Sequence, residues 1–100
     1  MEKINIDSLE SIGLTRNQSN VYLALLELGQ STADKVSEAV GIHRRTVYEN
    51  LDKLVKTGIA SKVLIGSKKH FEACKPDELK RFIEEKKLEV GRQEKSLNLL

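Results

Sequence analysis

The chain has 100 residues, enough for one domain with one small core, and this length excludes a second domain of ligand-binding size. Hydrophobic residues make up 39% and charged residues 32%, which is typical of a soluble globular protein and excludes a disordered chain. The chain begins without an apolar stretch of signal-peptide length, and no window approaches the roughly 20 apolar residues that span a bilayer, so we expect a cytoplasmic protein with no membrane contact. The single cysteine, Cys74, excludes an intrachain disulfide, and we expect a half-buried structural thiol.

The net charge of +2 conceals a local basic excess. Residues 1–40 hold three Lys and Arg against six Asp and Glu, residues 41–70 hold seven against two, and residues 71–100 hold seven against seven. A polyanion-binding surface requires such a concentrated positive segment. The charge distribution therefore places a candidate nucleic-acid contact in residues 41–70.

The first third of the chain has the spacing of helices. A short helix is expected over residues 7–11, and Gly13 ends it. Thr15 is predicted to open a second helix, which Gly29 closes. The residues of that helix expected to face the core are Val21, Ala24, Leu25 and Leu28.

Two further helices are predicted on either side of a tight glycine turn. Ser31 and Thr32 are cap types before a short helix that Gly41 ends. The next helix is predicted over residues 43–57, and Gly58 closes it. The inward faces are expected to consist of Ala33, Val36 and Val40 in the short helix and of Val47, Leu51 and Leu54 in the longer one.

From Ile59 onward the pattern changes to that of strands. The runs IASKVLI and HFEAC flank the polar stretch GSKK, which predicts a β-hairpin with its tip at residues 66–70. Pro76 cannot extend a ladder and suits a helix start, so a long final helix is expected from Asp77 to about Leu100. The predicted fold is mainly α with a small β-hairpin: a winged helix-turn-helix domain over residues 1–75 and a long C-terminal helix over residues 76–100.

The predicted order of helix, short helix, glycine turn, helix and hairpin is that of a winged helix-turn-helix. In this motif the helix after the turn enters the major groove of double-stranded DNA, because only that groove is wide enough, and the hairpin, or wing, reaches the neighbouring backbone. We therefore expect a sequence-specific DNA-binding transcriptional regulator with helix 43–57 as recognition helix and residues 66–70 as wing. The alternative is a winged-helix protein–protein interaction module whose basic helix binds an acidic protein surface.

The face of the recognition helix opposite Val47 carries the candidates for base contact. At about 100° per residue, Arg45 and Glu49 lie on that face. Arg45 is predicted to bond to a guanine edge, and Glu49 either accepts from a cytosine amine or is an ordinary surface residue. Tyr48, on the flank, either reaches a phosphate or packs over the hairpin.

The other candidates lie around this face. Arg44 and Thr46 share the first turn with Arg45, and His43 is expected as a substitute N-cap or a phosphate contact. Two wing lysines suit phosphate attraction on a flexible loop, although both they and the arginines could also be merely solvated charges. The predicted DNA-binding residues are Ser31, Thr32, His43, Arg44, Arg45, Thr46, Tyr48, Glu49, Ser67, Lys68 and Lys69.

The C-terminal helix has the spacing of a helix-pairing seam. The seam would consist of Leu79, Ile83, Val90, Leu97 and Leu100. Such a seam predicts a homodimer, because proteins of this class usually bind two half-sites related by a two-fold axis. The alternative is that the helix folds back on its own domain.

No catalytic residues, cofactor, metal or small-molecule ligand are expected. Two histidines and one cysteine offer no nucleophile–base spacing, and the sequence has no glycine-rich phosphate loop. A metal set of His43, His70 and Cys74 is disfavoured, because His70 and Cys74 would lie about 13 Å apart along an extended strand.

Three stretches resemble one known family. IGLTRNQSNVYLALLELG (12–29), STADKVSEAVGIHRRTVYENLDKLVKTGIA (31–60) and, less sharply, GSKKHFEACKPDEL (66–79) resemble TrmB-type transcriptional regulators, which are found mainly in archaea. The resemblance implies a dimeric, sequence-specific transcription factor with groove contacts on Arg44, Arg45, Thr46 and Tyr48 and a wing at residues 67–69. Many members carry a C-terminal effector domain that binds sugars. This chain stops at Leu100, so it is either a short stand-alone member or a fragment, and sugar sensing is not carried over.

Overall fold

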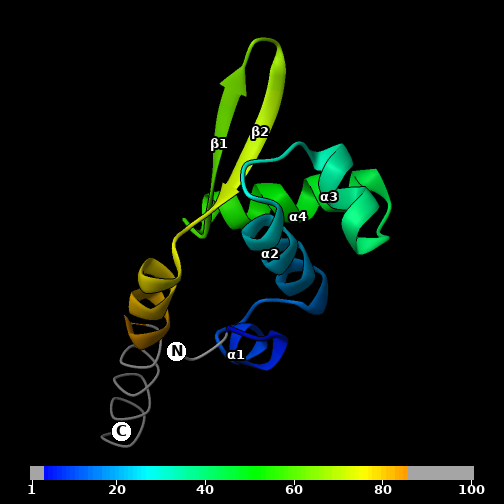
Figure 1. Ribbon diagram of the computed structural model, residues 1–100. Helices are drawn as coiled ribbons and strands as arrows, with labels where there is room; N and C mark the ends of the chain where they lie inside the picture. Colours follow the sequence, from blue (N-terminus) through cyan, green and yellow to red (C-terminus); the bar gives the residue numbers. More distant parts are fainter. Residues whose placement is uncertain (1–3, 86–100) are drawn as a thin grey trace, which may run out of the picture.

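The computed structural model describes residues 4–85 and has the predicted fold class, a helical body with one projecting hairpin (Figure 1). The elements in chain order are α1 (Ile6–Ser11), α2 (Arg16–Leu28), α3 (Ala33–Val40), α4 (Arg44–Lys56), β1 (Ala60–Ile65) and β2 (Lys68–Ala73). Residues 76–85 are helical and form the described part of the C-terminal helix. Residues 86–100 of the predicted helix lie outside the described residues. Among the helices that are described, none has both the length and the apolar character needed to cross a membrane.

Helix α2 is the centre of the helical body, and its ends are fixed by local chemistry. Thr15 accepts from the Gln18 amide while the Gln18 side chain accepts from the Thr15 amide, a capping box that satisfies two backbone donors. The expectation that Leu28 faces the core is wrong, since Leu28 is 45% exposed. The buried apolar side chains of α2 are instead Val21, Tyr22, Ala24 and Leu25.

The turn between α3 and α4 sets the direction of the recognition helix. Gly41 has the left-handed conformation, with φ 70°, which favours glycine. Ser37 Oγ donates to the Ile42 carbonyl at 2.6 Å across the turn. The expectation that His43 replaces the usual N-cap is confirmed, because its Nδ1 accepts from the Arg45 amide at 3.2 Å. α4 therefore begins with Arg44 as its first residue.

The hairpin pairs β1 with β2 in antiparallel register, from Ala60 opposite Ala73 to Ile65 opposite Lys68. A two-residue turn joins the strands, and Gly66 has φ 64° at its first position, where such hairpin turns need glycine. The expectation of a flexible loop carrying both wing lysines is corrected, because Lys68 and Lys69 are the first residues of β2. The pairing of β2 with β1 therefore fixes the backbone positions of these two lysines in the wing.

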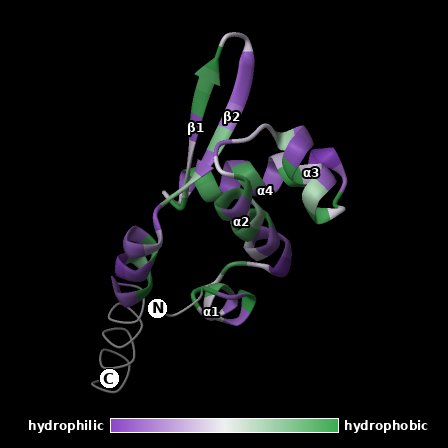
Figure 2. Cartoon of the chain, in the orientation of Figure 1, coloured by the Kyte–Doolittle hydropathy of each residue, from purple (hydrophilic) through white to green (hydrophobic). Residues whose placement is uncertain are grey.

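The two strands of the wing differ in character. Figure 2 shows the outer part of β1 as hydrophobic and that of β2 as hydrophilic. Val63, Leu64 and Ile65 are all exposed, Leu64 by 66%. The wing thus presents two cations on one strand beside exposed aliphatic side chains on the other.

The core joins the hairpin and the C-terminal helix to the helical body. Phe71 of β2 is fully buried, as are Leu51 and Leu54 of α4. The side chain of Leu79 is also fully buried in this core, so the expectation that it belongs to a dimer seam is wrong: a residue covered by its own chain cannot contact a partner. Ile83 is half-buried against the same core. The predicted seam residues Val90, Leu97 and Leu100 lie outside the described residues.

A buried tyrosine ties the end of the hairpin to α2. Tyr22 Oη donates to the Cys74 carbonyl at 3.2 Å and lies 3.9 Å from Cys74 Sγ. Burial raises the pKa of the Tyr22 phenol well above its ordinary value, and the neighbouring Cys74 adds to this shift. Burial also raises the pKa of the Cys74 thiol. Cys74 is half-buried, as expected of a structural thiol.

Candidate nucleic-acid interface

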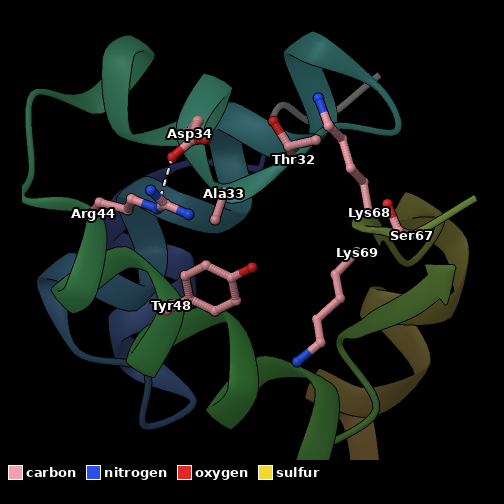
Figure 3. A pocket seen from close by; sticks show the side chains of 8 residues that line it. All are labelled: Thr32, Ala33, Asp34, Arg44, Tyr48, Ser67, Lys68 and Lys69. Atoms are coloured by element: carbon pink, nitrogen blue, oxygen red, sulfur yellow. Dashed lines mark ion pairs between the residues drawn. The ribbon is translucent and has the colours of Figure 1, made fainter. Parts of the chain in front are cut away.

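Three elements enclose a surface hollow of about 280 Å³ on the side of the molecule that carries the wing (Figure 3). They are the start of α3, the first turns of α4 and the tip of the hairpin. The residues that line the hollow are Thr32, Ala33, Asp34, Arg44, Tyr48, Ser67, Lys68 and Lys69. The fold thus brings together Thr32, two residues of the predicted recognition helix and the three predicted wing residues.

Arg44 is held inside this hollow by a residue that the sequence did not single out. Its Nε lies 2.8 Å from Asp34 Oδ1, and the two side chains are 64% and 60% exposed. The ion pair joins the first turn of α3 to the first turn of α4 (Figure 3). An acidic residue in the first turn of a helix is ordinarily explained by the helix dipole, so nothing in the sequence pairs Asp34 with Arg44.

Arg45 occupies a different environment. Its side chain is 86% exposed and does not line the hollow. Its contact with Glu49 is weak, with Nε 4.0 Å from Glu49 Oε1, one turn along the same helix. The two adjacent arginines are therefore differently placed, Arg44 between α3 and the wing and Arg45 on the outer face of α4.

Tyr48 connects the recognition helix to the wing. Its ring meets that of Phe71 edge-on, with 6.0 Å between centroids and 85° between planes. The ring is half-buried, and Figure 3 shows its hydroxyl within the hollow. Packing over the hairpin, one of the two interpretations of Tyr48, is thus observed, and contact with a phosphate stays a prediction.

Ser31, which was predicted to bind DNA, has its backbone groups and its hydroxyl hydrogen-bonded within the domain. It is 4% exposed, and its backbone forms a bridge with Phe71, donating at 3.0 Å and accepting at 2.8 Å. Its hydroxyl donates to the Gly29 carbonyl at 3.1 Å. Since these groups are used inside the domain, the expectation that Ser31 binds DNA is corrected. The cap of α3 is Thr32 instead, whose hydroxyl accepts from the Lys35 amide.

The remaining candidates lie outside the hollow. Thr46 is half-buried, and its carbonyl accepts from the Asn50 side chain at 2.8 Å. His43 is exposed, with one ring nitrogen used in the cap. The side chain of Glu49 is 65% exposed beside Arg45.

The electrostatic character of the hollow is cationic. Arg44, Lys68 and Lys69 supply three positive side chains, and Asp34 supplies the one carboxylate among its lining residues. The Thr32 and Tyr48 hydroxyls add neutral hydrogen-bonding groups. Such a lining suits an anion with several oxygen atoms, such as a phosphate.

Comparison with known proteins gives a consistent result at the level of sequence. Residues 9–77 match the family described as "Sugar-specific transcriptional regulator TrmB". The chain is 30% identical over 77 residues to the HTH-type sugar sensing transcriptional regulator TrmBL1 of Pyrococcus furiosus. The match covers 77% of this chain and 22% of that relative, so the chain spans about a fifth of its length.

Solved structures show the same fold. A possible transcriptional regulator from Methanosarcina mazei Go1 aligns with a TM-score of 0.74 at 17% identity, over 92% of this chain and 84% of that one. The ST1889 protein from Sulfolobus tokodaii aligns with a TM-score of 0.73 at 16% identity, over 91% and 92% of the two chains. A MarR family protein from Bacillus stearothermophilus aligns with a TM-score of 0.62 at 21% identity, over 91% and 64%. At these identities the structural similarities establish the fold alone.

Proposed function

Since the chain belongs to the TrmB family of transcriptional regulators, we propose that its winged helix-turn-helix binds double-stranded DNA in the cytoplasm and regulates transcription there. The observation that carries the proposal is the hollow, in which the start of α3, the first turn of α4 and the wing present three cations on one side of the domain. The proposal assigns the domain no catalytic role and no cofactor.

The recognition helix α4 enters the major groove with its first turn leading. Arg45 is the base-reading residue, because its side chain is 86% exposed and its guanidinium can bond to both acceptors of a guanine edge. Glu49 lies one turn further along the same face, where a carboxylate can accept from a cytosine amine or disfavour wrong sequences. This pair gives the domain its sequence preference.

The wing holds the domain on the backbone. Lys68 and Lys69 are exposed at the start of β2 and reach phosphates of the strand beside the major groove. Tyr48 donates its hydroxyl to a phosphate while its ring stays packed on Phe71. These contacts set the position of α4 without reading sequence.

The proposal includes a homodimer whose two-fold axis matches a palindromic site. With Leu79 removed from the seam by its burial, pairing would rest on Ile83, Val90, Leu97 and Leu100. Sedimentation at high protein concentration tests this part separately, and a strictly monomeric protein would refute it.

Selection of bound sequences from a random duplex pool tests the DNA-binding proposal. We expect a palindromic consensus, and affinity for it that falls as salt is raised. Arg45→Ala should cost about 1–3 kcal/mol and relax preference at one base pair of each half-site. Arg16→Ala is the matched control, because Arg16 is exposed at the start of α2 and does not line the hollow, so its loss should leave the preference unchanged. Absence of any duplex binding at low salt would refute the proposal.

A protein-interaction module is the second candidate, and the aliphatic strand of the wing favours it. Val63, Leu64 and Ile65 are 39%, 66% and 49% exposed on adjacent positions of β1, and exposed apolar clusters often mark protein contacts. Saturable binding to a protein partner, without a DNA-induced shift of the amide resonances of residues 44–49, would favour this candidate over DNA binding.

A further inference from the structure

We infer that Asp34 is a positioning residue, which holds the Arg44 guanidinium at a DNA backbone phosphate bound in the hollow between α3, α4 and the wing. This inference rests on the proposed function and specifies which of the two adjacent arginines contacts backbone and which contacts base. It assigns Arg44 to phosphate, whereas the sequence predicted a guanine contact for Arg45 and placed Arg44 among the first-turn candidates without a specific partner.

The geometry of the ion pair leaves most of the guanidinium available. Asp34 engages Nε, at 2.8 Å from Oδ1. An arginine side chain has five N–H donors in a fixed planar arrangement, so the amino groups at its end can still bond to an anion. Figure 3 shows the guanidinium extended from α4 to the start of α3, alongside Ala33. Arg44 is therefore turned away from the outer face of α4, on which Arg45 lies.

The surroundings of Arg44 are suited to a phosphodiester. Lys68 and Lys69 approach from the wing, and the hydroxyls of Thr32 and Tyr48 lie on two further sides of the same hollow. The hollow opens between the recognition helix and the wing, which are the two parts of this motif that lie on either side of one DNA strand. A phosphate of that strand would meet charge from α4 and from β2 together.

The ion pair itself is not explained by stability. Both side chains are more than half exposed, and exposed ion pairs contribute little to the free energy of unfolding. Its effect on a flexible arginine is different, because a side chain that is already held in its bound position loses less rotamer freedom when DNA binds. Asp34 also places a negative charge beside a polyanion, and this repulsion opposes binding. The two effects predict opposite signs for the loss of Asp34.

A double-mutant cycle separates the two effects. Asp34→Asn in the otherwise unchanged protein should weaken binding to the selected duplex by about twofold to tenfold, the range expected for loss of one preorganised side chain. In a protein that also carries Arg44→Ala, the same Asp34→Asn change should strengthen binding, because only the repulsion is left to remove. This reversal of sign is the signature of a residue that acts through Arg44.

A control variant and a modified duplex complete the test. Asp52→Asn removes an exposed carboxylate of α4 for which the described part of the chain shows no ion pair, and it should leave binding unchanged or tighten it. Replacing single phosphates by neutral methylphosphonates should reveal one position in each half-site at which the unchanged protein loses more affinity than the Arg44→Ala variant does. Thermal unfolding of Asp34→Asn should match that of the unchanged protein, because the pair is exposed.

Two results would overturn the inference. One is tighter DNA binding by Asp34→Asn in both backgrounds, which would make Asp34 a source of repulsion alone. The other is equal sensitivity of the unchanged protein and Arg44→Ala to every methylphosphonate position. Failure of the unchanged protein to bind any duplex is a distinct result, which refutes the proposed function before any variant is compared.

Discussion

Removing one positive charge from the wing should change the salt dependence of DNA binding by a calculable amount. Lys68 and Lys69 are exposed residues at the start of β2, and their positions are fixed by the pairing of Ile65 with Lys68 and of Leu64 with Lys69. Each lysine that neutralises a phosphate contributes about 0.9 to the slope of log K against log salt concentration. Lys68→Ala should therefore flatten that slope by about 0.9 for each half-site bound, which is about 1.8 for a homodimer on a palindromic site.

The change in this slope also determines how much affinity is lost at any chosen salt concentration. If the contact is purely electrostatic, the Lys68→Ala and unchanged proteins converge near 1 M salt and differ by about eightfold for each half-site at 0.1 M. The substitution should not alter the order of preference among sequences, because a phosphate contact reads none. Fluorescence anisotropy on the selected duplex and on an unrelated duplex, at four or five salt concentrations, measures both quantities.

The control for this experiment is Lys53→Ala. Lys53 is an exposed lysine of α4, but it lies beside Phe82 of the C-terminal helix and away from the wing. Its removal changes the net charge by the same amount and should leave the slope within error of that of the unchanged protein. Equal slopes for Lys68→Ala and Lys53→Ala would show that the wing makes no localised phosphate contact, and the interface described above would then be wrong.

Three further substitutions test other parts of the structure. Tyr48→Phe keeps the ring on Phe71 and loses only the hydroxyl, so DNA affinity should fall by about fivefold with no change in unfolding temperature; a lower unfolding temperature at full affinity would contradict this role. Leu79→Ala should cost about 2–5 kcal/mol in urea unfolding, independently of protein concentration, because the side chain is buried within its own chain; a concentration-dependent loss would instead place it in a subunit contact. Tyr22→Phe tests the raised pKa of the Tyr22 phenol. The unfolded chain releases the phenol proton from about pH 10, whereas the folded chain retains it. The free energy of unfolding should therefore fall as the pH rises above 10. The Tyr22→Phe variant should show a shallower fall in that range, and equal slopes for both proteins would refute the assignment.

Much of the candidate interface was predictable because its residues belong to elements with strong local signals. The first turn of α4 follows a glycine with φ 70° and a capping histidine, and both features depend on residues close together in the sequence. The positions of Arg44 and Tyr48 in the first turns of α4 follow once the element order is assigned. Their role in binding DNA stays a prediction until the experiments above are done.

Other members of the interface depended on contacts that the sequence does not display. Asp34 has the appearance of an ordinary first-turn acid until α3 and α4 are packed together, and only then does its carboxylate lie 2.8 Å from Arg44. Ser31 has the appearance of a helix cap until Phe71 is brought beside it, after which its backbone serves as a bridge to β2. In both cases the partner comes from a different element.

The sequence by itself determined the order of the elements and the ends of the helices α2 to α4, because caps, glycine conformations and apolar spacing act over a few residues of the chain. It also placed the positive charge in residues 41–70. Only the tertiary structure decided which side chain of each element meets which neighbour: Leu28 is left exposed, Leu79 is buried, and Arg44 is paired with Asp34 of α3. The physical reason is that side-chain direction and burial depend on segments distant in the sequence, and a local pattern specifies a face of a helix without specifying what covers it.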